Sequence, residues 1–157
     1  MMRMSKSFAG RWRDERLDEV LPTIVLAPRL RALVEAPLVR KAGGLVLEPL
    51  AANATGPEAF QDRTGYEAFI NKVHVDDFID VSGSEQVGAL VQQGARAAVD
   101  LSHRLETEGR FRVLLSLDAD LPTMTLRFFE RRHGEAWGAE DPDAFQLEEV
   151  LMIDTDS

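Results

Sequence analysis

The clearest pattern of apolar and polar residues lies in the second half of the chain. Between residues 84 and 108, apolar or small residues recur every three or four positions, which is typical of an amphipathic helix lying on a core. Ser82 and Glu85 match the capping box that precedes a helix, and Gly109 favours a helix end. Two members of the stripe are glycine and alanine, so we expect the helix to approach a sheet closely. The stripe consists of Val87, Val91, Gly94, Ala98, Leu101 and Leu105.

Alternation with a period of two predicts strands on both sides of this helix. Residues 111–117 and 124–128 each place their apolar side chains on one face, and a short turn between them favours an antiparallel hairpin. Further strands are expected over 69–75 and near 45–50, with a loop between them. The predicted fold class is α+β, a mainly antiparallel sheet packed against one long helix.

The end of the chain is ambiguous in its pattern. Residues 145–154 read as a last strand or as a helix, with Leu147, Leu151 and Ile153 in phase and Glu149 interrupting the row. A strand would add a further member to the predicted sheet.

The positive charge is concentrated at the N-terminus. Residues 1–44 hold nine Lys and Arg against five acidic residues, whereas residues 45–157 hold nine against twenty-two. Short apolar repeats punctuated by proline predict a helical arm that ends at a pair of glycines. At 157 residues we expect a single domain, with a basic helical arm over 1–44 and an acidic α+β body over 45–157. The arm packs on the body or docks on another molecule.

Composition restricts the classes of function. The formal net charge of −9 argues against affinity for nucleic acid and favours a protein partner with a basic surface. The lack of cysteine excludes disulfides, thiolate metal sites and a thiol nucleophile. No apolar stretch has the length of a membrane span and the N-terminus lacks a signal's apolar segment, so we expect a cytoplasmic protein without membrane contact.

The histidines are the first candidates for chemistry. On the predicted strand, His74 and Asp76 point the same way and are weak candidates for binding a divalent cation. A catalytic zinc takes three protein ligands and no third is evident, so a solvated strand face is the favoured interpretation. His103 lies beside the helical stripe, where partial packing is usual. We predict no metal site and no cofactor.

His133 and Glu135 lie just after the predicted hairpin. The pattern His-x-Glu is one half of the zinc deaminase signature, but its cysteine half is absent. The remaining interpretations of these two residues are a metal-free acid–base pair and a polar loop. No nucleophile elbow or phosphate loop is present. We therefore predict no catalytic residue, and a small hydrolase using His133/Glu135 or His74/Asp76 is kept as an alternative.

The segment LRFFERRHGEAW is the most distinctive candidate for binding a partner. It places Phe129 between Arg127 and Arg131 on one strand face, as an exposed aromatic flanked by cations, a combination enriched in interfaces. The alternative is that Phe129 is covered by the arm or a helix. Acidic residues follow, including Asp143. The predicted partner-binding residues are Arg127, Phe129, Arg131, Glu135, Trp137, Glu140 and Asp141.

Several short sequences occur in an order that resembles a known group. They are Val-His-Val-Asp, Gln-Gly, Phe-Arg-Val-Leu-Leu-Ser, the segment LRFFERRHGEAW and Glu-Glu-Val-Leu-Met-Ile-Asp, within residues 69–155. This order resembles small acidic bacterial proteins, mostly uncharacterised, some of them similar to immunity proteins paired with polymorphic toxins. The resemblance implies a non-catalytic protein that occupies a cognate toxin, without saying which residues do so. A subunit of a larger assembly, docking through the 1–44 arm, is a further alternative.

Overall fold

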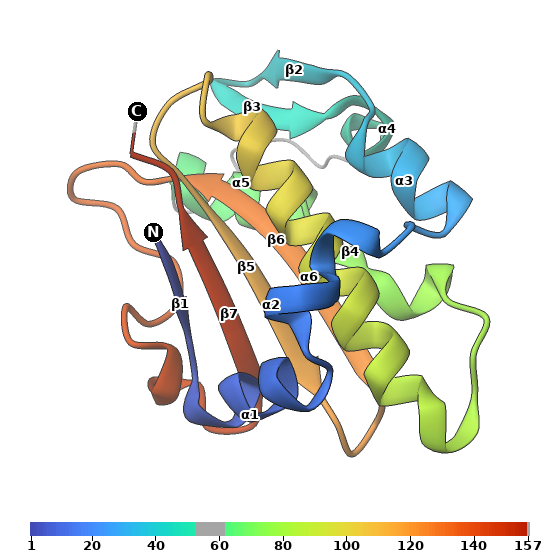
Figure 1. Ribbon diagram of the computed structural model, residues 1–157. Coiled ribbons are helices and arrows are strands. Elements are labelled where there is room, and N and C mark those ends of the chain that lie inside the picture. Colours follow the sequence, from blue (N-terminus) through green and yellow to red (C-terminus); the bar gives the residue numbers. More distant parts are fainter. Residues whose placement is uncertain (53–61, 157) are drawn as a thin grey trace.

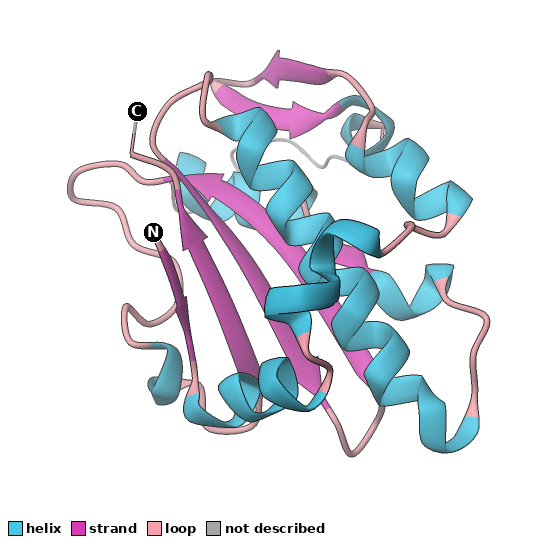
Figure 2. Ribbon diagram, viewed as in Figure 1, coloured by secondary structure: helices cyan, strands magenta, loops and turns pink. Residues whose placement is uncertain are grey.

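A computed structural model describes residues 1–52 and 62–156 (Figure 1). The fold is α+β, as the sequence predicts, with a mostly antiparallel sheet packed against one long helix (Figure 2). The main sheet has five strands in the order β1-β7-β5-β6-β4, and every neighbouring pair is antiparallel. Its strands are β1 (Met2–Met4), β4 (Val73–His74), β5 (Phe111–Asp118), β6 (Thr123–Glu130) and β7 (Glu149–Asp154).

The long helix α6 (Gln86–Leu105) crosses one face of the main sheet (Figure 1). The predicted stripe is confirmed, because its members are buried in the core except Val87, which is partly buried. A Cβ on Gly94 would clash with Met124 Sδ, so the missing side chain lets helix and sheet approach closely. A 3₁₀ turn (Gly83–Glu85) precedes the helix and Ser82 makes no side-chain capping bond, so the capping-box prediction was wrong.

The N-terminal segment is less helical than predicted and belongs to the same core. Besides α1 (Lys6–Asp14), α2 (Leu17–Val20), a 3₁₀ turn (Leu21–Thr23) and α3 (Pro28–Val34), it contains β1 and β2 (Leu38–Lys41). Strand β1 is paired with β7, so the first residues of the chain lie within the main sheet. The arm thus packs on its own body. Its buried contributions to the main core are Phe8, Trp12, Leu17, Leu26, Leu30, Val34 and Ala36.

A second layer of small elements lies beside the main sheet. Strand β3 (Gly44–Leu47), expected from the sequence, pairs with β2 in a separate two-stranded sheet, followed by α4 (Glu48–Ala51). The strand predicted over 69–75 was wrong in its first part, because residues Arg63–Ile70 form the helix α5. Asp62 caps α5 by accepting a hydrogen bond from Gly65 N at 2.7 Å. Phe69, expected on an inner strand face, is instead exposed, and most of the loop expected between the two strands lies outside the described residues.

The end of the chain forms a strand rather than a helix. Strand β7 lies between β1 and β5 in the main sheet, and Leu151 and Ile153 point into the main core as expected. Leu147 was predicted in the same row but is 89 % exposed, because the strand begins only at Glu149. The row is therefore two residues shorter than its pattern indicates.

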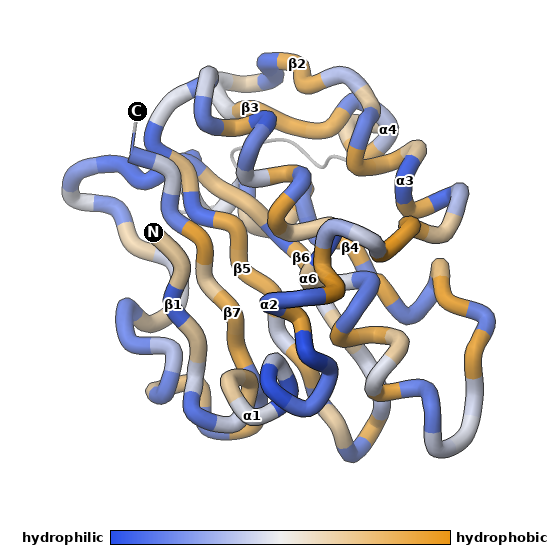
Figure 3. The backbone as a smooth tube through the Cα atoms, in the orientation of Figure 1, coloured by the Kyte–Doolittle hydropathy of each residue, from blue (hydrophilic) through white to orange (hydrophobic). Residues whose placement is uncertain are grey.

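The central strands are buried on both faces. Residues of β5 are buried from Phe111 to Leu117, and Figure 3 shows hydrophobic colouring along the middle of this strand. One face carries α6; the opposite face, called the outer face below, is covered by residues 131–148, called the outer loop. Trp137 and Phe145 of this loop pack on Leu114, Val150 and Met152.

No helix within residues 1–52 and 62–156 has both the length and the apolar character needed to cross a bilayer.

Candidate functional site

The strand register brings polar side chains together at one end of the outer face. On β5, Arg112 lies opposite Asp154 of β7 and opposite Phe129 of β6. Residues directly opposite each other on one face of a sheet are close enough to interact. The next row along the strands consists of apolar Leu114 flanked by Arg127 and Met152. The Arg112–Asp154 pair therefore lies in a row, called the charged row below, next to a mainly apolar row that also contains Arg127.

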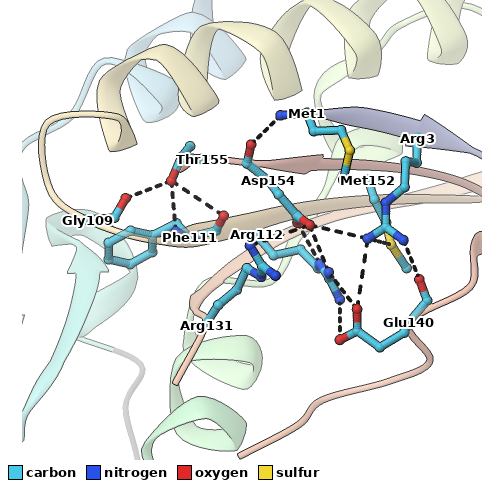
Figure 4. A network of polar contacts seen from close by, with 10 residues as sticks. All are labelled: Met1, Arg3, Gly109, Phe111, Arg112, Arg131, Glu140, Met152, Asp154 and Thr155. Carbon is cyan, nitrogen blue, oxygen red and sulfur yellow. Dashed lines mark hydrogen bonds and ion pairs between the residues drawn. The ribbon is translucent and has the colours of Figure 1, made fainter. Parts of the chain in front are cut away.

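Asp154 and Arg112 form a buried ion pair in this charged row. Arg112 Nε donates to Asp154 Oδ1 at 2.7 Å and Nη2 donates to Oδ2 at 2.9 Å, and their side chains are 3 % and 2 % exposed. Two further arginines contact the same carboxylate: Arg3 Nη2 donates at 3.2 Å and Arg131 Nη1 lies 3.7 Å away (Figure 4). Three cations therefore surround one buried carboxylate.

Glu140 of the outer loop binds the remaining edge of the Arg112 guanidinium (Figure 4). Arg112 Nη1 donates to Glu140 Oε1 at 3.1 Å and Nη2 donates to Oε2 at 3.0 Å. Unlike Asp154, the Glu140 side chain is 77 % exposed. Arg112 thus joins a carboxylate inside the sheet to one that faces water.

The network shifts the pKa values of its members. Burial alone would raise the pKa of Asp154, but the hydrogen bonds from Arg112 and the charges of Arg112, Arg131 and Arg3 outweigh it and lower the pKa. The hydrogen bonds from Arg112 lower the pKa of Glu140. The bonds to Asp154 and Glu140 raise the pKa of Arg112. All three groups are thereby held in their charged forms.

Acidification is expected to destabilise the wild type more than Glu140→Gln. The pKa values of Asp154 and Glu140 are lower in the folded state than their ordinary values, which lie near 4. Their stabilisation is therefore complete above about pH 5 and is lost as the pH falls through the lowered folded-state values. Urea unfolding at pH 7, 5, 4 and 3 measures the difference between the two proteins. Parallel losses of stability would contradict a contribution from Glu140.

Trp137 closes the outer face beside this network. The guanidinium of Arg127 lies 4.3 Å from the centre of the Trp137 ring, a cation–π contact, and the rings of Phe129 and Trp137 are 5.7 Å apart. Phe129 is only 3 % exposed. The prediction of an exposed aromatic was wrong, because the loop that follows β6 folds back over the strand. Gly138, with φ of +70°, supplies a left-handed turn beside Trp137.

The environment of Arg127 is unusual for a charged side chain. Its Nε is buried without a hydrogen-bond partner, and Nη1 donates to Ala68 O at 3.4 Å. Burial lowers its pKa, an effect that the charge of Glu148 partly opposes. Trp137 and the sheet therefore partly enclose this cation.

Helix α5 completes the site beside the end of β6, beyond the residues that pair with β4. The carboxylate of Glu67, fully buried, accepts from Leu45 N at 2.8 Å and from Glu130 N at 3.1 Å, and it pairs with Arg132. Asn71 Nδ2 donates to Leu45 O and Phe128 O. These two side chains join β3 to β6 where no direct strand pairing exists among the described residues. No sequence signal distinguished Glu67 or Asn71, because their roles depend on tertiary contacts alone.

A pocket of about 220 Å³ opens above the charged row. Five of the seven predicted partner-binding residues line it. Of the other two, Arg127 contacts the ring of Trp137, and Asp141 is exposed beside Glu140. Arg110, Arg112 and Arg132, which the sequence did not single out for binding, also line it. The five are Phe129, Arg131, Glu135, Trp137 and Glu140.

His133 and Glu135, predicted as a possible acid–base pair, line the same pocket. His133 is exposed, while Glu135 Oε1 accepts a long hydrogen bond from Thr64 N at 3.4 Å, in the first turn of α5. A carboxylate at a helix N-terminus is favoured by the helix dipole. Glu135 therefore has a structural contact that does not involve His133.

The weak metal candidates do not alternate along one strand. Residues Val75–Phe78 form a 3₁₀ turn, so the strand ends at His74 and the predicted shared face with Asp76 was wrong. Asp76 Oδ1 accepts from Met124 N at 2.9 Å, whereas His74 is exposed. His103 is also exposed, near the end of α6. Across the part of the chain that the structure describes, no group of three or more His, Asp or Glu residues could hold a metal ion.

A wider groove of about 520 Å³ lies at the opposite end of β5. The turn after β5, the N-terminus of α1 and the last part of the outer loop form its walls, and Leu147 lies among them. Two cations on the wall are Lys6 and Arg11, and Arg11 is paired with Glu149 at 3.1 Å. The acidic residues on its wall are Asp118, Asp120, Asp143, Glu148 and Glu149.

Comparison with protein families matches residues 7–157 to the family described as "Uncharacterized protein PM0498 family". A search of curated proteins and a search of solved structures find no match. The match covers nearly the whole chain, including most of the arm, which the sequence resemblance did not reach.

Proposed function

Because the chain belongs to the uncharacterized protein PM0498 family, its role has to be argued from its own surface, and we propose that it is a non-catalytic protein-binding module. The most concrete form of this proposal is an immunity-type inhibitor that neutralises a basic bacterial toxin in the cytoplasm. The net charge of −9 favours a basic partner, since opposite charge raises the rate of association. The family description names no activity, so it neither adds to the proposal nor opposes it.

The observation that carries the proposal is the exposure of Leu147 on the wall of the groove of about 520 Å³ at the end of β5. This groove is called the acidic groove below. This leucine is 89 % exposed, and five acidic residues share the groove wall with it. An apolar anchor within a polar rim is the usual anatomy of a binding surface. A partner with an apolar pocket ringed by Lys and Arg matches this arrangement.

The outer loop is held rigidly enough to present such an anchor. Trp137 and Phe145 pack on the sheet, and Asp143 Oδ1 accepts a hydrogen bond from Lys6 N at 2.8 Å. A surface fixed before binding loses less conformational entropy when a partner docks. In this proposal Arg127, Phe129 and Trp137, which the sequence suggested as direct contacts, support the loop from behind, while exposed Asp141 and Asp143 extend the acidic rim.

Leu147→Ser is expected to weaken binding of the partner at least about tenfold, equivalent to ~1.4 kcal/mol. The partner is first identified by capture from native-host extract on immobilised wild-type protein and is then purified. Calorimetry with the purified partner at low, physiological and high salt gives affinities for the wild type and the variant. We expect the affinity to fall as salt rises, because the rim charges are exposed.

Val25→Ser is the matched control, since Val25 is an exposed apolar residue beside the 3₁₀ turn that follows α2, and it does not line the acidic groove. It should bind the partner as the wild type does. Equal affinities for the Leu147 and Val25 variants, or an affinity insensitive to salt, would count against this surface.

The second candidate is a small hydrolase, and one observation favours it: His133 and Glu135 line the same pocket. General acid–base catalysis requires such groups within reach of one substrate. Function that survives His133→Ala and His74→Ala would exclude catalysis by these histidines. The third alternative, docking through the 1–44 arm, has less support because the apolar side chains of the arm are used in the protein's own core.

A further inference from the structure

The guanidinium of Arg112 has two edges, and the two are occupied very differently. Asp154 takes the inner edge, where both side chains are almost fully buried. Glu140 takes the outer edge with two parallel hydrogen bonds, although its own side chain is 77 % exposed. The outer edge is therefore a rigid, pre-oriented fork that meets its ligand at the protein surface.

Glu140 can leave this fork at a low cost to itself. Its carboxylate is already mostly in water, so a change of side-chain rotamer hydrates it further without creating a buried charge. Arg112 cannot follow, because Asp154 holds its inner edge and the sheet surrounds its stem. A vacated outer edge would thus remain in place and would require another acceptor.

Other cations line the approach to that edge. Arg110, Arg131 and Arg132 belong to the wall of the same pocket as Arg112. Arg132 is occupied by Glu67 and Glu130, and Arg131 has its contact with Asp154 at 3.7 Å, longer than a hydrogen bond. Arg110 is exposed. An anion at the outer edge would therefore be near one or two cations that are incompletely engaged.

We propose that the outer edge of Arg112 is an oxyanion-binding site in which Glu140 is the resident internal ligand. An incoming carboxylate or phosphate group would replace the Glu140 carboxylate on the fork and gain the charges of Arg131 and Arg110. Planar guanidinium forks match both groups through paired hydrogen bonds. A pocket of about 220 Å³ accommodates a small anion or the end of a larger ligand.

This site is independent of the surface proposed for protein binding. The pocket lies at the beginning of β5 and the acidic groove at its end. Eight strand residues span roughly 25 Å. Loss of one binding activity is therefore distinguishable from loss of the other.

Glu140→Ala is expected to bind sodium phosphate or sodium succinate about tenfold more tightly than the wild type, because the internal competitor is gone. Calorimetry gives the affinities, and the resonances of Arg112 Nη1 and Nη2, the atoms that hold Glu140 in the wild type, report whether the anion reaches the fork. The two probes separate the sources: a gain for phosphate alone assigns a phosphate ligand, and a gain for succinate alone assigns a carboxylate. A gain for both supports a general oxyanion site.

Glu85→Ala is the matched control, since it removes the same charge from an exposed position just before the first turn of α6. Glu85 does not line the pocket, and it lies at the start of a helix about 30 Å long. Adding Arg131→Gln to the Glu140 variant should reduce the gain at least about threefold if Arg131 contributes its charge. Glu140→Gln, which keeps a neutral acceptor, provides the comparison should the alanine variant be poorly folded. If the Glu140 variants bind both probes no better than the Glu85 variant, Glu140 only fastens the loop and the proposal is overturned.

Discussion

Asp154→Ala is expected to lower the free energy of unfolding by about 3–5 kcal/mol, the usual cost of removing one partner of a buried ion pair. The substitution leaves the inner edge of Arg112 without an acceptor inside the sheet, where the arginine side chain is 3 % exposed. It also removes the anion that Arg3 and Arg131 share, since both contact Asp154 Oδ2. Urea unfolding followed by circular dichroism at neutral pH measures the loss.

The double variant Arg112→Met, Asp154→Leu provides the control for this interpretation. Replacing both charges with apolar side chains of similar volume removes the desolvation cost together with the attraction. We therefore expect the double variant to be more stable than Asp154→Ala alone, although Glu140 loses its partner. A double variant that is the less stable of the two would mean that the pair contributes net stability beyond avoiding an unpaired charge.

The sequence predicted those elements whose pattern is long and local. The stripe of α6 spans almost the whole helix, and the hairpin of β5 and β6 has two strands of eight residues joined by a short turn. In both cases the contacts that decide the structure lie near each other in the chain. Strand β1, with three residues, is too short to show a period of two in its side chains. It forms because its backbone pairs with the edge of β7.

The sequence indicated part of the pocket lining but not its geometry, and it did not single out Arg110, Arg112 or Arg132. The residues near LRFFERRHGEAW do gather around one pocket, but Phe129 is buried because residues that follow it fold back over the strand. The ion pair between Arg112 and Asp154 depends on the register of two strands separated by 42 positions in the sequence. Charge pattern alone does not determine such a register, because residues 133–157 contain no Lys or Arg and Asp154 must pair with a cation from a distant part of the chain.

Glu67→Ala is expected to be similarly destabilising, by roughly 3–5 kcal/mol, because an unsatisfied buried polar group costs about 1–3 kcal/mol and three groups lose an acceptor, although one of them, Arg132, keeps its contact with Glu130. These groups are the backbone N–H of Leu45, the backbone N–H of Glu130 and the Arg132 guanidinium. Glu67 is itself fully buried, so water cannot easily replace it. Urea unfolding measures the loss, and amide hydrogen exchange at Leu45 and Glu130 shows where it arises.

Glu108→Ala is the matched control, because Glu108 is an exposed acidic residue just after α6, and surface substitutions of this kind usually change stability by less than about 0.5 kcal/mol. The exchange measurement makes the test specific. If Glu67 joins the small sheet to the main sheet, exchange should accelerate on both sides of the junction, at β3 and at the end of β6, while the interior of β5 stays protected. A loss of stability below about 1 kcal/mol, or faster exchange confined to α5, would show that the two sheets are held together by apolar packing alone and that the Glu67 carboxylate is not their link.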